Sequence, residues 1–99
     1  MNLLKSGSGI GKGETDMANV ITVTEENFEK AISGPAVIVD FYANWCGPCQ
    51  AMLPVFEKVS GDYEGKVSFC KVNVDDSKKL AIKNRVMSIP AFLLFKNGE

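Results

Sequence analysis

Strand-like and helix-like segments alternate along this 99-residue chain, and that order limits the possible folds more than any other feature. Four runs of β-branched and apolar residues are typical of strands: residues 20–23, 36–43, 67–74 and 91–95. Three segments between them have apolar residues at helical spacing: residues 25–33, 49–64 and 78–84. The order β-α-β-α-β-α-β predicts an α/β sheet with right-handed parallel crossovers.

Local signals refine three of these elements. Thr24 is suited to cap the first helix, because its hydroxyl can accept a hydrogen bond from a free N–H group of the first turn. The second helix has one apolar stripe, formed by Met52, Phe56, Val59 and Tyr63. Asn97-Gly98 directly follows the last strand and predicts a hairpin turn.

Residues 1–16 differ in composition from the rest of the chain. Glycine alternates there with small or polar residues, a pattern typical of a flexible N-terminal tail or an expression scar. Gly11-Lys12 does not complete a phosphate-binding loop, because Ser6 and Gly13 stand where that motif needs Gly and then Ser or Thr. We therefore expect one folded domain over residues 17–99.

Positive and negative side chains nearly balance. Eleven Lys and Arg against twelve Asp and Glu give a formal net charge of −1, which argues against a nucleic-acid-binding or membrane-surface protein. The chain has no histidine, which excludes a His-based triad, general base or metal site. No apolar run approaches the roughly 18 residues of a membrane span, and no signal peptide is recognisable. We expect a soluble, cytoplasmic protein.

Two of the three cysteines lie in the motif Trp45-Cys46-Gly47-Pro48-Cys49, between a buried strand and a helix. A helix N-terminus favours a thiolate, so the pKa of the Cys46 thiol should be lowered. Cys49 follows one helical turn later, within disulfide reach of Cys46. Redox chemistry is the favoured interpretation, and a structural disulfide or a zinc site completed by a carboxylate are the alternatives.

The segment from Val39 to Cys49 resembles the active-site segment of the thioredoxin family. The similarity continues through Pro54, through residues 71–75 and through Ile89-Pro90, and it covers about residues 20–99. It implies a thioredoxin-like fold, with a central mixed sheet flanked by helices, and a protein-disulfide reductase without a cofactor. It also implies two kinds of partner: disulfide-containing client proteins and an NADPH-dependent thioredoxin reductase.

The resemblance implies roles for four residues. Cys46 is the exposed nucleophile that attacks a client disulfide, and the more buried Cys49 resolves the mixed disulfide. Asp40 is the candidate base that deprotonates Cys49, because a carboxylate inside an apolar strand is desolvated and its pKa is raised. The alternative is that Asp40 only accepts a hydrogen bond from a backbone or hydroxyl donor. Lys71 modulates this titration, or else its ammonium reaches water while its stem packs.

The resemblance also places client binding at Trp45, Gly47, Pro48, Ile89 and Pro90. Trp45 shields the disulfide and shapes the docking surface. Pro90 is expected in cis opposite the cysteines, so that the backbone of Ile89 pairs with an extended client segment. Cys70, in the middle of a strand, is expected to be a small buried hydrophobic residue.

Two features depart from the family pattern. Gln50 stands where family members often have a basic residue, which weakens the positive charge near Cys46. The family also has a further strand and a C-terminal helix after this turn, so we expect a domain truncated after the fourth strand. The open edge of that strand would favour self-association or a completing partner. The alternative function is therefore an interaction module with little redox turnover, and a disulfide oxidase or isomerase ranks third.

Overall fold

Strands and helices alternate along residues 19–99, the part of the chain that the computed structural model describes. The strands are β3 (Val20–Thr22), β4 (Val37–Tyr42), β5 (Ser68–Asn73) and β6 (Ala91–Phe95). The helices are α1 (Phe28–Ala31), α2 (Gly47–Asp62) and α3 (Lys78–Lys83). Each predicted strand and helix is present, and the tail expected at residues 1–16 lies outside the described residues.

The strands form one mixed sheet in the order β3-β5-β4-β6. β5 runs parallel to both β3 and β4, whereas β6 runs antiparallel to β4. The parallel sheet expected from the order of elements is therefore wrong at β6, and the mixed sheet implied by the family resemblance is confirmed. The connection through α3 leaves the chain at the end of the sheet where β5 stops, and β6 starts there and runs back along β4.

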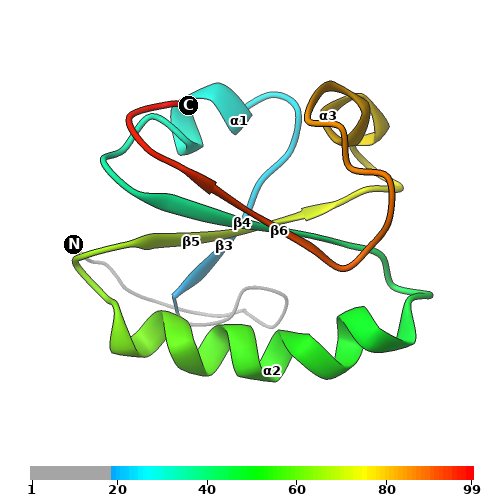
Figure 1. Ribbon diagram of the computed structural model, residues 1–99, viewed down its shortest axis with the longest axis horizontal. Helices are drawn as coiled ribbons and strands as arrows, with labels where there is room; N and C mark the ends of the chain where they lie inside the picture. Colours follow the sequence, from blue (N-terminus) through cyan, green and yellow to red (C-terminus); the bar gives the residue numbers. More distant parts are fainter. Residues whose placement is uncertain (1–18) are drawn as a thin grey trace.

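The helices lie on both sides of the sheet, with α1 and α3 on one face and α2 on the other (Figure 1). We call these the α1/α3 face and the α2 face. Side chains along a strand alternate between the two faces. On the α1/α3 face they form the main apolar core, which contains Val37, Val39, Phe41, Cys70 and Val72 together with Val23, Phe28, Ile32 and Leu80 from the flanking segments.

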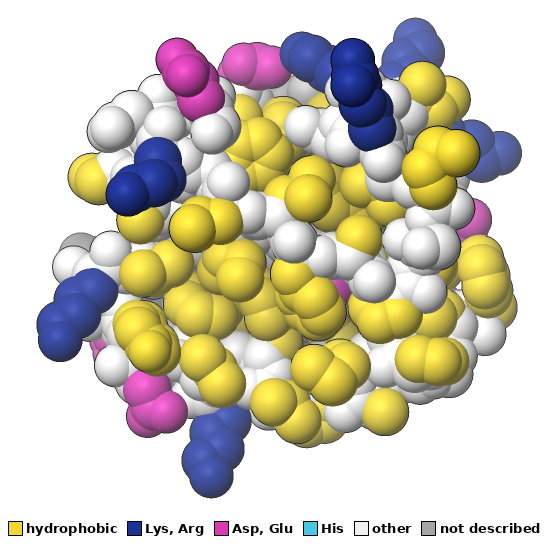
Figure 2. Space-filling view, viewed as in Figure 1, with side chains coloured by type: hydrophobic (Ala, Val, Ile, Leu, Met, Phe, Trp, Pro, Cys, Tyr) yellow, Lys and Arg dark blue, Asp and Glu magenta, His cyan; other side chains and the backbone are white. Residues whose placement is uncertain are grey.

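The α2 face is less completely covered. A groove of about 390 Å³ runs between α2 and the strands, and it is lined by Ile38, Met52, Val55, Phe56, Val59, Tyr63, Val67, Phe69, Phe92 and Leu94. Figure 2 shows apolar side chains spread over this region of β6 and α2, with most charged side chains at its margin. The expectation that the last strand is uncovered on one face is confirmed, since Phe92 is 38% and Leu94 59% exposed.

The predicted apolar stripe of α2 is only partly buried. Phe56 lies in the core, but Met52, Val59 and Tyr63 are exposed and line the groove. The residues of α2 that the sheet buries are Cys49, Leu53, Phe56 and Ser60.

The first helix begins later than expected. The backbone N–H of Thr24 donates to Oδ1 of Asn27 at 2.8 Å, which closes a turn before the helix. Asn27, and not Thr24, is the residue that precedes the first helical position, Phe28. The predicted cap at Thr24 is therefore wrong, because the Asn27 side chain bonds the Thr24 backbone and holds it in the turn.

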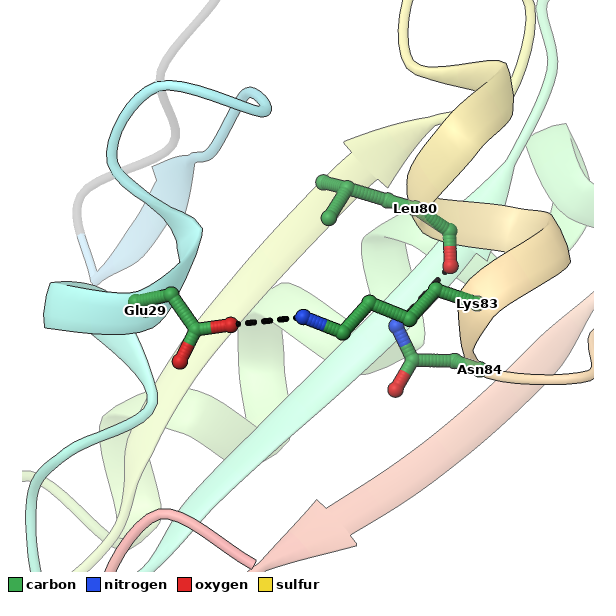
Figure 3. A network of polar contacts seen from close by, with 4 residues as sticks. All are labelled: Glu29, Leu80, Lys83 and Asn84. Carbon is green, nitrogen blue, oxygen red and sulfur yellow. Dashed lines mark hydrogen bonds and ion pairs between the residues drawn. The ribbon is translucent and has the colours of Figure 1, made fainter.

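Two polar contacts join α1 and the segment before it to α3. Oε2 of Glu25 accepts a hydrogen bond from the backbone N–H of Lys79 at 3.1 Å. Glu29 and Lys83 form an ion pair at 3.0 Å, and the Asn84 side chain donates to the Leu80 carbonyl beside it (Figure 3). These contacts hold the two short helices together over the apolar core.

The predicted hairpin turn at Asn97-Gly98 is present. Both residues have positive φ, 55° and 90°, as two-residue hairpin turns require. The backbone N–H of Glu99 donates to the Lys96 carbonyl at 3.1 Å, and that of Asn97 donates to the Gly34 carbonyl at 3.1 Å. The chain therefore reverses direction directly after β6.

Candidate active site

The cysteine motif occupies the junction between β4 and α2. Cys46 is the N-cap residue of α2, and its Sγ accepts a hydrogen bond from the backbone N–H of Cys49 at 3.2 Å. Pro48 lies in the first turn, where the N–H that proline lacks would have had no helical partner. The sulfur of Cys46 thus occupies the position at which a free helix N–H and the helix dipole stabilise negative charge.

Cys46 and Cys49 are joined by a disulfide, with their Cα atoms 5.2 Å apart. This pairing is the one that the three-residue spacing predicted. Within residues 19–99, no group of three or more His, Cys, Asp and Glu residues is placed to hold a metal ion. In the same part of the chain, no helix is long and apolar enough to cross a membrane.

The exposure expected for Cys46 is wrong for this oxidised protein. Cys46 is 5% exposed and Cys49 is 0% exposed, so both are buried. Sγ of Cys46 lies 4.0 Å from the carbonyl oxygen of Ile89, on the connection between α3 and β6. That connection covers the disulfide from a part of the chain 43 residues away, which local sequence patterns could not reveal.

The peptide bond between Ile89 and Pro90 is cis, the isomer that the family resemblance implies. Both residues are half-buried. The structure therefore brings together the cysteine pair and the Ile89-Pro90 segment, as expected for the candidate client-binding residues.

Trp45 is 70% exposed beside the disulfide. Its indole Nε1 donates to Oδ2 of Asp75 at 2.9 Å, which orients the ring. A groove of about 410 Å³ lies next to it, lined by Trp45, Val74, Ala81, Val86, Met87, Ser88 and Ile89. The sequence analysis gave Asp75 no role at the site beyond the matched segment 71–75, and its position after the end of a strand was the signal that could have placed it there.

Gln50 ties the first turn of α2 to the end of β4. Its Nε2 donates to the Ala43 carbonyl at 3.3 Å, and the backbone N–H of Cys46 donates to the same carbonyl at 3.2 Å. The neutral side chain at this position therefore makes a structural contact instead of adding positive charge near Cys46.

Asp40 lies in the middle of β4 on the α2 face. It is 1% exposed, and neither of its carboxyl oxygens has a hydrogen-bond partner among the described residues. Burial raises the pKa of Asp40 to about 6, although the nearby Lys71 ammonium opposes part of that rise. Such a carboxyl can gain and lose a proton near neutral pH.

Lys71 is the residue of β5 directly opposite Asp40 in the parallel register. It is 6% exposed, so most of its side chain is buried. Nζ of Lys71 lies 5.7 Å from the centroid of the Tyr42 ring. Sequence reasoning missed Tyr42, because this contact depends on the register between β4 and β5.

Cys70 lies on the other side of the sheet from the cysteine pair. It is 2% exposed within the apolar core, and burial raises the pKa of its thiol to about 11. Cys70 therefore stays protonated and unreactive at neutral pH, as expected for a small buried hydrophobic residue.

Comparisons with known proteins agree with this geometry. The profile of the Thioredoxin family matches residues 19–99. Thioredoxin from Staphylococcus haemolyticus is 45% identical over 80 residues, which cover 81% of this chain and 77% of that protein. Thioredoxin from Staphylococcus aureus is 41% identical over the same shares. A solved structure of Plasmodium falciparum thioredoxin superposes with a TM-score of 0.76 at 41% identity, covering 80% of this chain and 78% of that one.

Proposed function

This chain belongs to the thioredoxin family and is a thiol–disulfide reductase, and from that premise we propose that Cys46 is its nucleophile and Cys49 its resolving cysteine. The observation that carries this assignment is the position of Cys46 Sγ at the N-cap of α2, where it accepts the N–H of Cys49. A thiolate at Cys46 is stabilised there, whereas Cys49 lies behind it and is 0% exposed.

The reaction then proceeds in two exchanges. In the reduced protein, the Cys46 thiolate attacks one sulfur of a client disulfide, a Cys46–client bond forms, and the other client sulfur leaves as a thiolate. The Cys49 thiolate next attacks Cys46 Sγ and displaces the second client sulfur. Two electrons pass to the client, the client sulfurs take up protons, and the Cys46–Cys49 disulfide remains.

The second exchange requires that Cys49 lose its proton, and we assign Asp40 as the base. Support comes from the burial of Asp40, its lack of a hydrogen-bond partner among the residues described, and a pKa of about 6. Asp40 and Tyr42 project from the same face of β4, and Tyr42 packs against the cysteine pair. Lys71, opposite Asp40, modulates its titration.

Clients would bind beside the disulfide, at Trp45, Gly47, Pro48, Ile89 and Pro90. The Ile89 carbonyl next to Cys46 Sγ is placed to accept a backbone hydrogen bond from an extended client segment. A Cβ atom at Gly47 would meet no atom within 4 Å, so packing within the chain does not require glycine there. The open space at Gly47 supports its role in the approach of a client.

The partners and compartment complete the proposal. An NADPH-dependent thioredoxin reductase would return the disulfide to the dithiol, and no cofactor bound to this chain is needed. The cytoplasm is the compartment in which a reducing dithiol is kept reduced. Self-association through the outer edge of β6 stays a prediction, supported by the position of β6 at the end of the strand order β3-β5-β4-β6, and sedimentation velocity at micromolar concentration would test it.

Trapping of the mixed disulfide tests the order of the two cysteines. We expect the reduced Cys49→Ser variant to form a stable covalent adduct with a disulfide-bonded protein, because the resolving thiol is gone. The matched Cys46→Ser variant should form no adduct. Equal trapping by both variants, or client binding without any covalent adduct, would contradict the assignment.

A further inference from the structure

Tyr42 connects two groups of residues at the site and has no role in the mechanism above. It is 8% exposed and packs in a cluster with Ala43, Cys46 and Cys49. Its ring also faces the Lys71 ammonium, with Nζ 5.7 Å from the ring centroid. One aromatic side chain therefore contacts both the redox pair and the buried cation.

The carboxyl of Asp40 and the ammonium of Lys71 are neighbours without a direct hydrogen bond. The two residues are opposite each other in parallel strands, so their side chains project from the same face of the sheet. Neither oxygen of Asp40 accepts a hydrogen bond from any described residue. Buried opposite charges often form a direct contact, and the electron-rich face of the Tyr42 ring, which attracts a cation, competes for this ammonium.

We propose that Tyr42 is a positioning residue whose ring holds the Lys71 ammonium and keeps it from forming a direct ion pair with Asp40. The Lys71 side chain is long enough to adopt either arrangement, and the contact with Tyr42 is the one observed. Held in this way, the cation leaves the Asp40 carboxyl able to accept a proton from Cys49. This inference deepens the proposed function and rests on the role of Asp40 as base.

Among residues 19–99, few other titratable groups face Asp40. Lys71 is the titratable residue that β5 contributes on this face, Cys49 is the one buried in α2, and Tyr42 follows on β4. β6 contributes only Phe92 and Leu94, and Cys70 lies on the opposite face. Among the groups of this part of the chain, the Lys71 ammonium is the charge that acts on the pKa of Asp40, so its distance from the carboxyl matters most. A direct ion pair would lower that pKa.

An NMR titration of the Asp40 carboxyl in the oxidised protein tests the inference, because the disulfide removes Cys46 and Cys49 from the titration. We expect Tyr42→Leu to lower the Asp40 midpoint by about one pH unit or more, as a newly formed ion pair would. The matched Tyr42→Phe variant, which keeps the ring, should leave the midpoint unchanged. In a Lys71→Met background, Tyr42→Leu should no longer lower it.

Two results would overturn the inference. One is an unchanged Asp40 midpoint in Tyr42→Leu, and the other is a decrease of the same size with and without Lys71. A second measurement needs no variant: the ε-methylene protons of Lys71 should show an upfield ring-current shift in the wild-type protein, and its absence would also contradict the proposal. Both readouts are independent of turnover. If Asp40→Asn retained full turnover, the base assignment would fail, while the titration would still decide the role of Tyr42.

Discussion

The two faces of this sheet are built from the same strands, but they differ in burial and in the polarity of their side chains. On the α1/α3 face, β4 presents Val37, Val39 and Phe41, each 0% exposed within a continuous apolar core. On the α2 face, the same strand presents Ile38, Asp40 and Tyr42, and the neighbouring strand β5 adds the buried Lys71. The face that holds the chemistry also has an open apolar groove.

The difference shows how a small domain separates stability from reactivity. A buried carboxyl and a buried ammonium each lower the free energy of unfolding unless they are fully paired. Here the opposite face is apolar along β4 and at Cys70 and Val72 of β5, and its burial can offset that loss. Adjacent residues of one strand therefore serve different purposes, and substitutions on the two faces should have different effects.

The largest expected effect is on activity and comes from the α2 side. Cys46→Ser should reduce turnover of a protein disulfide to background, because no other sulfur can take the first step. The matched variant Cys70→Ala, on the α1/α3 face, should retain turnover. A spectrophotometric assay of disulfide reduction measures both. Residual turnover in Cys46→Ser, or a comparable loss in Cys70→Ala, would contradict the separation of the faces.

The next largest effect is on stability and comes from the α1/α3 face. Phe41→Ala removes a side chain that is 0% exposed, and it should lower the free energy of unfolding by about 3–5 kcal/mol. Phe92→Ala removes the same atoms from a residue that is 38% exposed on the α2 face, and it should cost only about 1–2 kcal/mol. Denaturant unfolding measures the two values, and equal losses would show that the groove is buried in solution.

Asp40 should make the α2 face sensitive to pH. Its pKa is about 6 in the folded protein against 3.8 for an unperturbed aspartate, so the folded state binds the proton more tightly than the unfolded chain. The free energy of unfolding should therefore fall as pH rises from about 4 to about 6, by roughly 3 kcal/mol at most. Asp40→Asn should remove this dependence and be the more stable protein at pH 8.

Denaturant unfolding of the oxidised proteins between pH 4 and pH 8 would measure this effect. The wild type and Asp40→Asn should converge toward the acidic end of that range, where Asp40 is protonated in the folded state. Parallel pH profiles for the two proteins would show that Asp40 does not titrate differently on folding.

The smallest effect is expected at the ion pair that joins α1 and α3. Its side chains are 66% and 74% exposed, and exposed pairs contribute about 0–1 kcal/mol. Lys83→Met should therefore change the free energy of unfolding by less than about 0.5 kcal/mol. Thermal unfolding at low and high salt measures it, with Glu29→Gln as the matched partner variant. A larger loss would mean that the core under α1 and α3 depends on this contact.

Much of the fold could be predicted from local sequence patterns. The strand and helix segments, the cysteine pair at the start of α2 and the turn at Asn97-Gly98 each depend on residues close together in the chain. The errors arose where distant parts meet. The reversed direction of β6 depends on its pairing with β4, which is distant in the sequence, and the exposure of Met52 depends on what covers α2.

For the candidate site too, residues close together in the sequence could be predicted, and contacts between distant segments could not. Cys46 and Cys49 were predicted from spacing alone, whereas the roles of Asp40 and Pro90 came mainly from the family resemblance. The contact between Lys71 and Tyr42 was missed, because it exists only when β4 and β5 align in one register. The low exposure of Cys46 was also missed, since the covering carbonyl belongs to Ile89.

The strict alternation of β4 restricts how this strand can change over time. Removing or adding a single residue between Val37 and Asp40 would move the Asp40 carboxyl to the apolar α1/α3 face and place a valine side chain on the α2 face. Loops absorb insertions and deletions readily, but here such an event would ruin folding and catalysis together. This strand can therefore accept substitutions of single side chains during evolution, whereas insertions and deletions within it would be selected against.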